Sequence, residues 1–151
     1  MLAACGEPRE VCVSDENVER TRRVAEAFNA RDIDAMLGYC DPSIEFHVTF
    51  EAVGGVYHGH DGLRRWHRDL EEAWGEIRLE PEAFFDLGEQ TMAFSVMRAR
   101  GRQSGAEVVM PAAQVARWRD GRCVYFKAYA DRHDALRELG VSEVELEAIA
   151  P

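Results

Sequence analysis

Three polar side chains, each inside a largely apolar run, carry groups that could do chemistry. His47 lies in the alternating run 43–50, and an imidazole that titrates near neutral pH suits a general acid or base. Arg98 could hold a carboxylate, enolate or phenolate oxygen through two N–H groups. Gln114 could donate a hydrogen bond to a ligand carbonyl. Together these residue types suit a proton transfer in which negative charge develops on oxygen.

Each of the three also has a purely structural alternative. Alternation turns Phe46 toward the core and His47 away from it, unless a β-bulge intervenes. Arg98 could pair with an acid such as Glu45, or lie at the mouth of the fold in water. Gln114 could be a core amide whose hydrogen bonds are satisfied. The residues alone leave these alternatives open.

No metal or other cofactor is expected. His58, His60 and His67 are close in sequence, but two helical turns separate His60 from His67, which is poor geometry for a shared metal. None of the cysteines forms a CxxC pair; they are Cys5, Cys12, Cys40 and Cys123. This cysteine usage indicates a reduced, cytoplasmic setting.

The run 91–131 is the element that would position Arg98 and Gln114. It is predicted to form three antiparallel strands, with a first turn around Gly105 and a second at Asp120-Gly121. Helical spacing, strand alternation and end signals predict the other elements, which are helices over 14–29, 33–40, 61–75 and 131–140 and strands over 43–50 and 77–85. This order predicts an α+β fold in which helices lie on one side of a strongly bent sheet. An enclosed space between helix and sheet is where a pocket would form.

Length and charge restrict the kinds of partner. The 151 residues predict one domain over 14–151 after a flexible leader over 1–13. A net charge of −10, with the arginines interleaved among acids, argues against nucleic acid and membrane surfaces as partners. Leu2–Gly6 has the form of a bacterial lipoprotein cleavage box, but only Met1 precedes it in the sequence, so the match is expected to be accidental. A lipid-anchored protein is therefore the weakest alternative.

Five stretches, in this order along the chain, carry a family resemblance: ERTRRVAEAFNARDID at 19–34, DPSIEFH at 41–47, YHGHDG at 57–62, WRDGR at 118–122 and DRHDAL at 131–136. With them the chain resembles the nuclear-transport-factor-2-like superfamily and, within it, the SnoaL-like, ketosteroid-isomerase-related proteins. The resemblance implies a cone-shaped barrel: a strongly curved, mixed but mostly antiparallel sheet wrapped around the N-terminal helices. It implies no single reaction, because the family includes isomerases, cyclases, epoxide hydrolases, dehydratases and non-catalytic binding domains.

The catalytic residues of the isomerase branch are not preserved. The position of its tyrosine corresponds to Val24, and the position of its protonated aspartate corresponds to Gln114. The position of its base corresponds to His47 or Val48, depending on a one-residue gap. The comparison therefore argues against a steroid-type isomerisation by the usual Tyr/Asp/Asp set.

The resemblance also implies which residues face the pocket. His47, Arg98 and Gln114 would be the catalytic set if the protein is an enzyme. The residues expected to line the pocket are Val24, Tyr57, Trp66, Phe94, Val96, Ala112, Trp118, Phe126 and Ala128. Such a pocket would hold a small, largely apolar organic molecule.

Two functions remain open at this point. The first is cofactor-free isomerase, cyclase, dehydratase or hydrolase chemistry, and the second is a non-catalytic ligand-binding or assembly module. The outward face of the last strand carries Tyr125, Lys127 and Tyr129, which suit a protein interface. Because the superfamily commonly dimerises through its outer sheet, a homodimer is expected.

Overall fold

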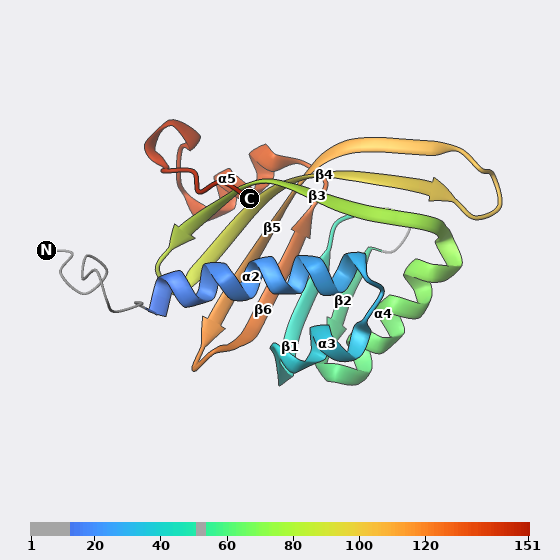
Figure 1. The fold of residues 1–151 in the computed structure, drawn as a ribbon, viewed down its shortest axis with the longest axis horizontal. Helices are drawn as coiled ribbons and strands as arrows, with labels where there is room; N and C mark the ends of the chain where they lie inside the picture. The colour runs from blue at the N-terminus through green and yellow to red at the C-terminus, as the bar shows by residue number, and fades with distance from the viewer. Residues whose placement is uncertain (1–12, 51–53) are drawn as a thin grey trace, which may run out of the picture.

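The computed structural model describes residues 13–50 and 54–151, which form a helix-covered, strongly curved sheet (Figure 1). The first long helix, α2, runs from Val13 to Asn29, and the short α3 runs from Ile33 to Gly38. Asp32 caps α3 by accepting a hydrogen bond from the Ala35 amide at 3.0 Å. The leader predicted over 1–13 lies, apart from Val13, outside the described residues, and so does the LAACG stretch.

Within the described residues, six strands form one sheet in the order β2-β1-β6-β5-β4-β3. Only the pairing of β1 with β6 is parallel, so the predicted mixed, mostly antiparallel sheet is confirmed. The strands are β1 Cys40–Val48, β2 Gly55–His58, β3 Trp74–Leu87, β4 Gln90–Gly101, β5 Glu107–Arg119 and β6 Arg122–Tyr129.

The two faces of the sheet are covered by different helices. α2 and α4 (Gly59–Ala73) pack on the inner, concave face (Figure 1). α5 (Arg132–Leu139) packs on the outer face, against β5 and β6. Asn29 ties the end of α2 to the sheet, because its amide group donates to the Leu79 carbonyl and accepts from the Leu79 N–H, both at 2.8 Å. These two hydrogen bonds hold the end of α2 against β3 on the concave face of the sheet.

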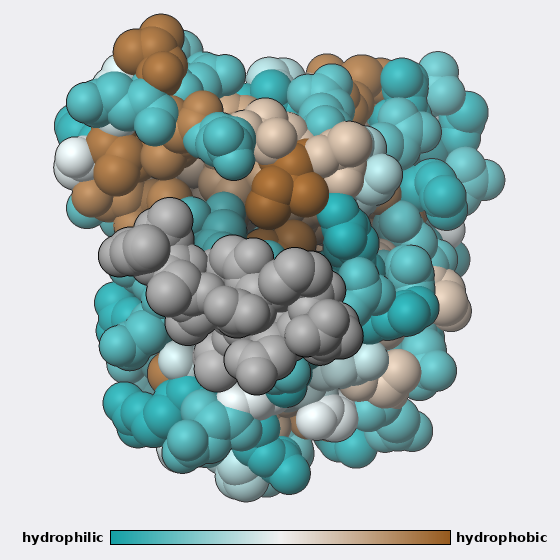
Figure 2. All heavy atoms as spheres, turned by 60° about the vertical axis from the view of Figure 1, so that its left-hand side comes forward, coloured by the Kyte–Doolittle hydropathy of each residue, from teal (hydrophilic) through white to brown (hydrophobic). Residues whose placement is uncertain are grey.

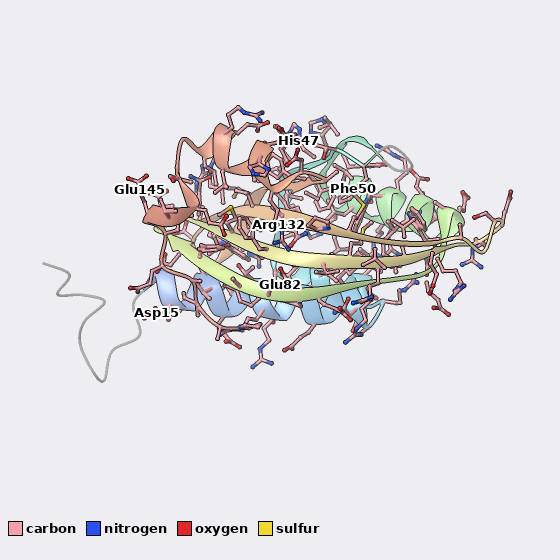
Figure 3. All side chains as sticks on the ribbon, turned by 90° about the horizontal axis from the view of Figure 1, so that it is seen from above. Asp15, His47, Phe50, Glu82, Arg132 and Glu145 are labelled. Carbon is pink, nitrogen blue, oxygen red and sulfur yellow. The ribbon has the colours of Figure 1, made fainter. Side chains whose placement is uncertain are left out.

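Arg132 fastens α5 to the outer face of the sheet. Its Nη2 donates to the Ser95 carbonyl and to Glu82, both at 2.7 Å, and its Nε donates to the Ala112 carbonyl at 3.2 Å (Figure 3). The guanidinium also lies over the Phe94 ring, 4.8 Å from its centroid. One side chain thus joins α5 to β3, β4 and β5.

The turns and caps form where local sequence requires them. Asp120 and Gly121 both have positive φ, 51° and 78°, as a two-residue hairpin turn demands. Asp131 caps α5 through the His133 amide, and Gly140 ends it with a φ of 69°. These predicted features are confirmed.

The structure differs from the predicted elements at several points. α4 begins at Gly59, with His58 in the capping position, so Asp61 lies in its first turn and does not cap it. β3 is one continuous strand, because Pro81 is tolerated on an edge strand, where the register shifts beside it. β2 is only four residues long and was not predicted. Among the described residues, no helix is long and apolar enough to cross a bilayer.

Candidate functional site

A cavity of about 100 Å³ lies between the concave face of the sheet and the helices α2 and α4. Its wall is formed by residues of the helices α2, α3 and α4 and of the strands β1, β3, β4, β5 and β6. Four of the residues that the sheet contributes to the wall are small: Ala93, Ser95, Ala116 and Ala128. Because these side chains do not reach the helices opposite, the middle of the core stays hollow.

Aromatic rings from both the sheet and the helices also line the cavity. Phe46 and Phe126 stack with centroids 4.9 Å apart and planes 7° apart. Trp66 from α4 lies 4.7 Å from the Phe46 ring and 6.0 Å from the Phe28 ring of α2. Flat, rigid surfaces of this kind favour a planar or ring-shaped apolar guest.

Gln114 is the polar group of the wall whose hydrogen bonds are incomplete. Its Oε1 accepts a hydrogen bond from the Ser95 hydroxyl at 2.9 Å. This is its only side-chain hydrogen bond within the described part of the chain, so one polar atom of the amide remains unpaired although the residue is only 8% exposed. The amide Nε2 is the atom left unpaired, and a ligand oxygen that reaches it could accept its hydrogen bond.

The side chains of a second polar cluster at the wall are hydrogen-bonded within the cluster. The Thr21 hydroxyl donates to the Asn17 carbonyl at 2.8 Å and lies 2.7 Å from the Thr91 hydroxyl. Trp118 Nε1 donates to the same Thr91 oxygen at 2.9 Å. The indole N–H of Trp66, by contrast, is buried without a hydrogen-bond partner in the described residues. Gln114 and Trp66 are thus the wall residues with unused polar capacity.

The titratable groups among the described lining residues are two thiols, Cys40 and Cys123. Burial raises the pKa of Cys40 to about 12. Burial raises the pKa of Cys123 as well, and the neighbouring Cys40 adds to the effect. Neither thiol can therefore act as a base near neutral pH.

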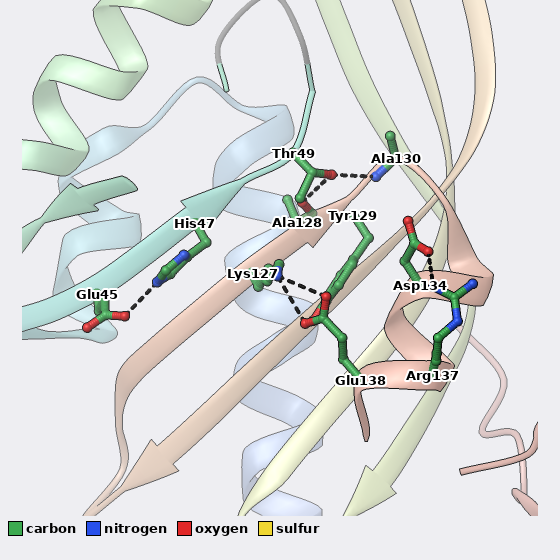
Figure 4. A network of polar contacts seen from close by, with 10 residues as sticks. All are labelled: Glu45, His47, Thr49, Lys127, Ala128, Tyr129, Ala130, Asp134, Arg137 and Glu138. Carbon is green, nitrogen blue, oxygen red and sulfur yellow. Dashed lines mark hydrogen bonds and ion pairs between the residues drawn. The ribbon is translucent and has the colours of Figure 1, made fainter. Parts of the chain in front are cut away.

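His47 does not face the cavity. No register shift occurs between Glu45 and Val48, so the strand alternates regularly and His47 points to the outer face of the sheet, away from α2 (Figure 3). There its Nε2 lies 2.5 Å from a Glu45 carboxylate oxygen, and its ring lies 5.1 Å from the Tyr125 ring (Figure 4). Hydrogen bonding to His47 lowers the pKa of Glu45. The prediction that His47 meets the pocket is wrong.

Arg98 also lies on the outer face. Its side chain is 55% exposed, and its Nε donates to Glu80 at 2.8 Å, which raises its pKa further. The predicted inward face of β4 is the wrong one, because Ala93, Ser95 and Met97 line the cavity. Arg98 and Gln114 are therefore on opposite faces and are not brought together.

The error on β4 has a clear physical cause. Its outer face is buried too, since Phe94 packs with Phe85 beneath α5 and against Arg132. Both faces are therefore apolar in this part of the strand, and alternation cannot tell them apart. Val96 shares the outer parity of Phe94 and does not line the cavity.

The remaining predicted pocket residues divide into two groups. Those that line the cavity are Val24, Trp66, Trp118, Phe126 and Ala128. Tyr57 is buried but turns its hydroxyl to Asp69 at 3.3 Å, and Ala112 is buried outside the wall. The sequence analysis did not include Ser95 among the pocket residues. Ser95 could have been recognised as a small polar residue two positions from the apolar Ala93 and Met97 on the same strand.

The predicted interface residues of β6 are engaged within the chain (Figure 4). Lys127 Nζ lies 3.0 Å from Glu138 of α5, and the Tyr129 hydroxyl donates to the same carboxylate at 2.9 Å. Tyr129 is only 4% exposed, so the expectation that it lies on an open face is wrong. α5 covers this part of the sheet, whereas Tyr125 is half-buried, with the Arg117 guanidinium over its ring.

Other surface features do not form a recognisable site. In the described residues, no cluster of three or more His, Cys, Asp or Glu side chains is arranged to hold a metal ion. Figure 2 shows apolar surface at the end of the molecule that carries α5, where Val144 is 93% exposed.

The fold agrees with comparisons to known proteins. A family model described as a SnoaL-like domain matches residues 21–126, so the chain belongs to the SnoaL-like family, within the nuclear-transport-factor-2-like superfamily. No curated protein matches the sequence at a significant level.

Solved structures show the same fold. An NTF2-like protein of unknown function from Burkholderia pseudomallei is 26% identical, with a TM-score of 0.72 over 81% of this chain and 95% of that one. TerC is 23% identical, with a TM-score of 0.71 over 82% and 97% of the two chains. A protein of ketosteroid isomerase-like fold from Catenulispora acidiphila is 14% identical, with a TM-score of 0.68 over 82% and 94%. At identities below 25% the last two likenesses concern the fold alone.

Proposed function

We propose that this protein binds a small, uncharged, mainly apolar organic molecule in the cavity, with Gln114 as the polar anchor. The observation that carries the proposal is the unpaired amide atom of Gln114 on an otherwise apolar wall. Burying an ion against such a wall without a partner would be costly, which favours a neutral guest.

The volume of the cavity favours a small guest. Pockets for drug-sized ligands measure about 300–1,000 Å³, whereas an apolar cavity of about 150 Å³ takes up benzene. The cavity of about 100 Å³ is smaller than that, so it suits a guest of at most about one small ring, with one carbonyl or hydroxyl group for Gln114. Two proteins that share the fold have been crystallised with small molecules: TerC was co-crystallised with polyporic acid, and the Catenulispora protein is in complex with trimethylamine.

A binding module is favoured over acid–base catalysis. The residues expected to move a proton and stabilise charge, His47 and Arg98, lie on the other face of the sheet and are already paired with Glu45 and Glu80. The thiols at the wall have raised pKa values and stay protonated near neutral pH. Binding needs only the aromatic surface and the Gln114 amide, both of which the cavity provides.

The test compares matched ligands and matched variants. Each ring-sized carbonyl compound in a panel is paired with the hydrocarbon of the same shape, and binding is followed by calorimetry and tryptophan fluorescence. The Gln114→Leu substitution should weaken binding of the carbonyl compound about 2- to 12-fold, the worth of one neutral hydrogen bond, and leave the hydrocarbon unaffected. Gln103→Leu, in the exposed β4–β5 turn, is the matched control.

A cavity-filling variant provides the second arm of the test. Ala116→Leu should abolish binding of both ligands, because a larger side chain occupies the space of the guest. Binding that is unchanged in both Gln114→Leu and Ala116→Leu would refute the proposal.

We also propose that two copies associate through the outer face of β1 and β6. The Glu45–His47 pair lies there, apart from α5 (Figure 4), and the Tyr125 ring is 5.1 Å from the His47 ring. Light scattering on the eluted peak should give twice the monomer mass. Tyr125→Glu should shift the mass toward the monomer, and Val144→Glu at the opposite end should not; a monomeric native chain would contradict the proposal.

A further inference from the structure

Cys40 and Cys123 face each other across the parallel pair of strands. Cys40 opens β1, Cys123 lies near the start of β6, and the two Cα atoms are register partners. Neighbouring strands lie about 4.8 Å apart, within the Cα–Cα range of about 4.4–6.8 Å that a disulfide spans. Both side chains line the same cavity, so both project from the same face of the sheet.

The two thiols are free and only weakly engaged. Cys40 Sγ donates to the Met36 carbonyl at 3.3 Å, and Cys123 Sγ donates to the Tyr125 carbonyl at 3.2 Å. Because S–H is a weak donor, rotating each sulfur toward the other gives up little. At 5% and 3% exposure, neither sulfur can meet a protein thiol, but a small molecule that enters the cavity can reach both.

We propose that Cys40 and Cys123 are a redox modification site, which a small peroxide converts to an intramolecular disulfide. One thiolate attacks the O–O bond of hydrogen peroxide, becomes a sulfenic acid and releases the first water molecule. The second thiol then attacks the sulfenic sulfur, the S–S bond forms, and the second water leaves. The two thiols lose two electrons and two protons, and the peroxide is reduced to two water molecules.

Burial determines how fast this site responds. It raises the pKa of both thiols, so the reactive thiolate is scarce at neutral pH and oxidation is slow. The pair therefore responds to sustained oxidation, and a small dithiol reverses the reaction. The bond joins β1 to β6 and closes a loop from Cys40 to Cys123, which restricts the unfolded chain and stabilises the fold.

The experiment uses the full chain, treated with hydrogen peroxide at pH 8.5 and trapped with N-ethylmaleimide under denaturing conditions. After trapping, the oxidised chain should weigh less than the reduced chain, because it carries two N-ethylmaleimide groups where the reduced chain carries four. Dithiothreitol added before trapping should restore the higher mass, and oxidation should raise Tm by about 5 °C. A proteolytic map of the oxidised chain should contain one cross-linked peptide joining Cys40 to Cys123.

The controls use the other cysteines of the chain. Cys5→Ser with Cys12→Ser should keep the mass loss, whereas Cys40→Ser and Cys123→Ser should each abolish it. The map of the unsubstituted chain decides the matter even where a variant folds poorly. Sulfinic acid at either residue without a cross-linked peptide, or a cross-link that joins another pair, would overturn the proposal.

Discussion

Gln114 is oriented by a single hydroxyl, that of Ser95, at the wall of the cavity. Ser95→Ala should lower the free energy of unfolding by about 1–2 kcal/mol, because the amide oxygen of Gln114 would be buried without a partner. Urea denaturation at neutral pH measures the change. Adding Gln114→Leu should recover part of the loss, since both polar groups are then gone.

A serine elsewhere in the chain is the control for this prediction. Ser142 is exposed and makes no capping hydrogen bond, so Ser142→Ala should change stability by less than about 0.5 kcal/mol. Equal effects of the two serine substitutions would show that the Ser95 hydroxyl does not hold Gln114.

The residue scale is also where sequence reasoning reached its limit. The chemistry that His47, Arg98 and Gln114 could perform follows from residue type. Whether they can act together depends on which face of the sheet each side chain occupies. Regular alternation predicted the outward turn of His47, and the family resemblance argued the other way. The ion pair of Arg98 with Glu80 could not be predicted, because it depends on the register of β3 against β4.

At the scale of elements, Arg132 is the strongest single attachment of α5. Arg132→Met should lower the free energy of unfolding by about 2–4 kcal/mol, because it keeps the apolar stem but leaves the Ser95 and Ala112 carbonyls without their donor. Chemical denaturation is again the measurement.

The same helix offers the matched control. Arg137 is 71% exposed and, within residues 13–50 and 54–151, pairs only with Asp134, so Arg137→Met should cost less than about 0.5 kcal/mol. If the two substitutions destabilise the protein equally, the carbonyl contacts of Arg132 are not what fastens α5.

The elements themselves were predictable wherever a local signal decided them. Asp120 and Gly121 both adopt the positive φ that a two-residue hairpin turn requires. Asp131 caps the start of α5, and Gly140 ends the helix with a positive φ. The inward face of β4 was not predictable, because α5 buries Phe94 on one side while the cavity takes Ser95 on the other. β2 is too short for its alternation to be distinguished from a loop.

At the scale of the whole molecule, stability should fall in alkaline solution. The pKa of Cys40 is about 12 in the folded protein and about 9.0 in the unfolded chain, so between these values the folded state binds more protons. The contribution is complete below about pH 9 and is lost as the pH rises toward 12, with a limiting slope of about 1.4 kcal/mol per pH unit. The raised pKa values of the buried Cys123 and Tyr129 act in the same direction.

Urea midpoints measured from pH 7 to pH 11 with dithiothreitol present would reveal this dependence. Cys40→Ser should flatten the decline above pH 9, whereas the exposed-site variant Ser142→Ala should follow the native curve. Identical curves for Cys40→Ser and the native chain would contradict the assignment of the effect to Cys40.

The parallel pairing of β1 with β6 also determines the order of folding. Glu45 pairs with Tyr125, far along the chain, whereas β4, β5 and β6 are joined by short turns. Because distant segments lose more entropy on closing, the meander can form first and β1 docks last. Phe46 then meets Phe126 only at the end, so the cavity does not exist until folding is almost complete. A guest that binds there should therefore slow unfolding and leave the rate of folding unchanged.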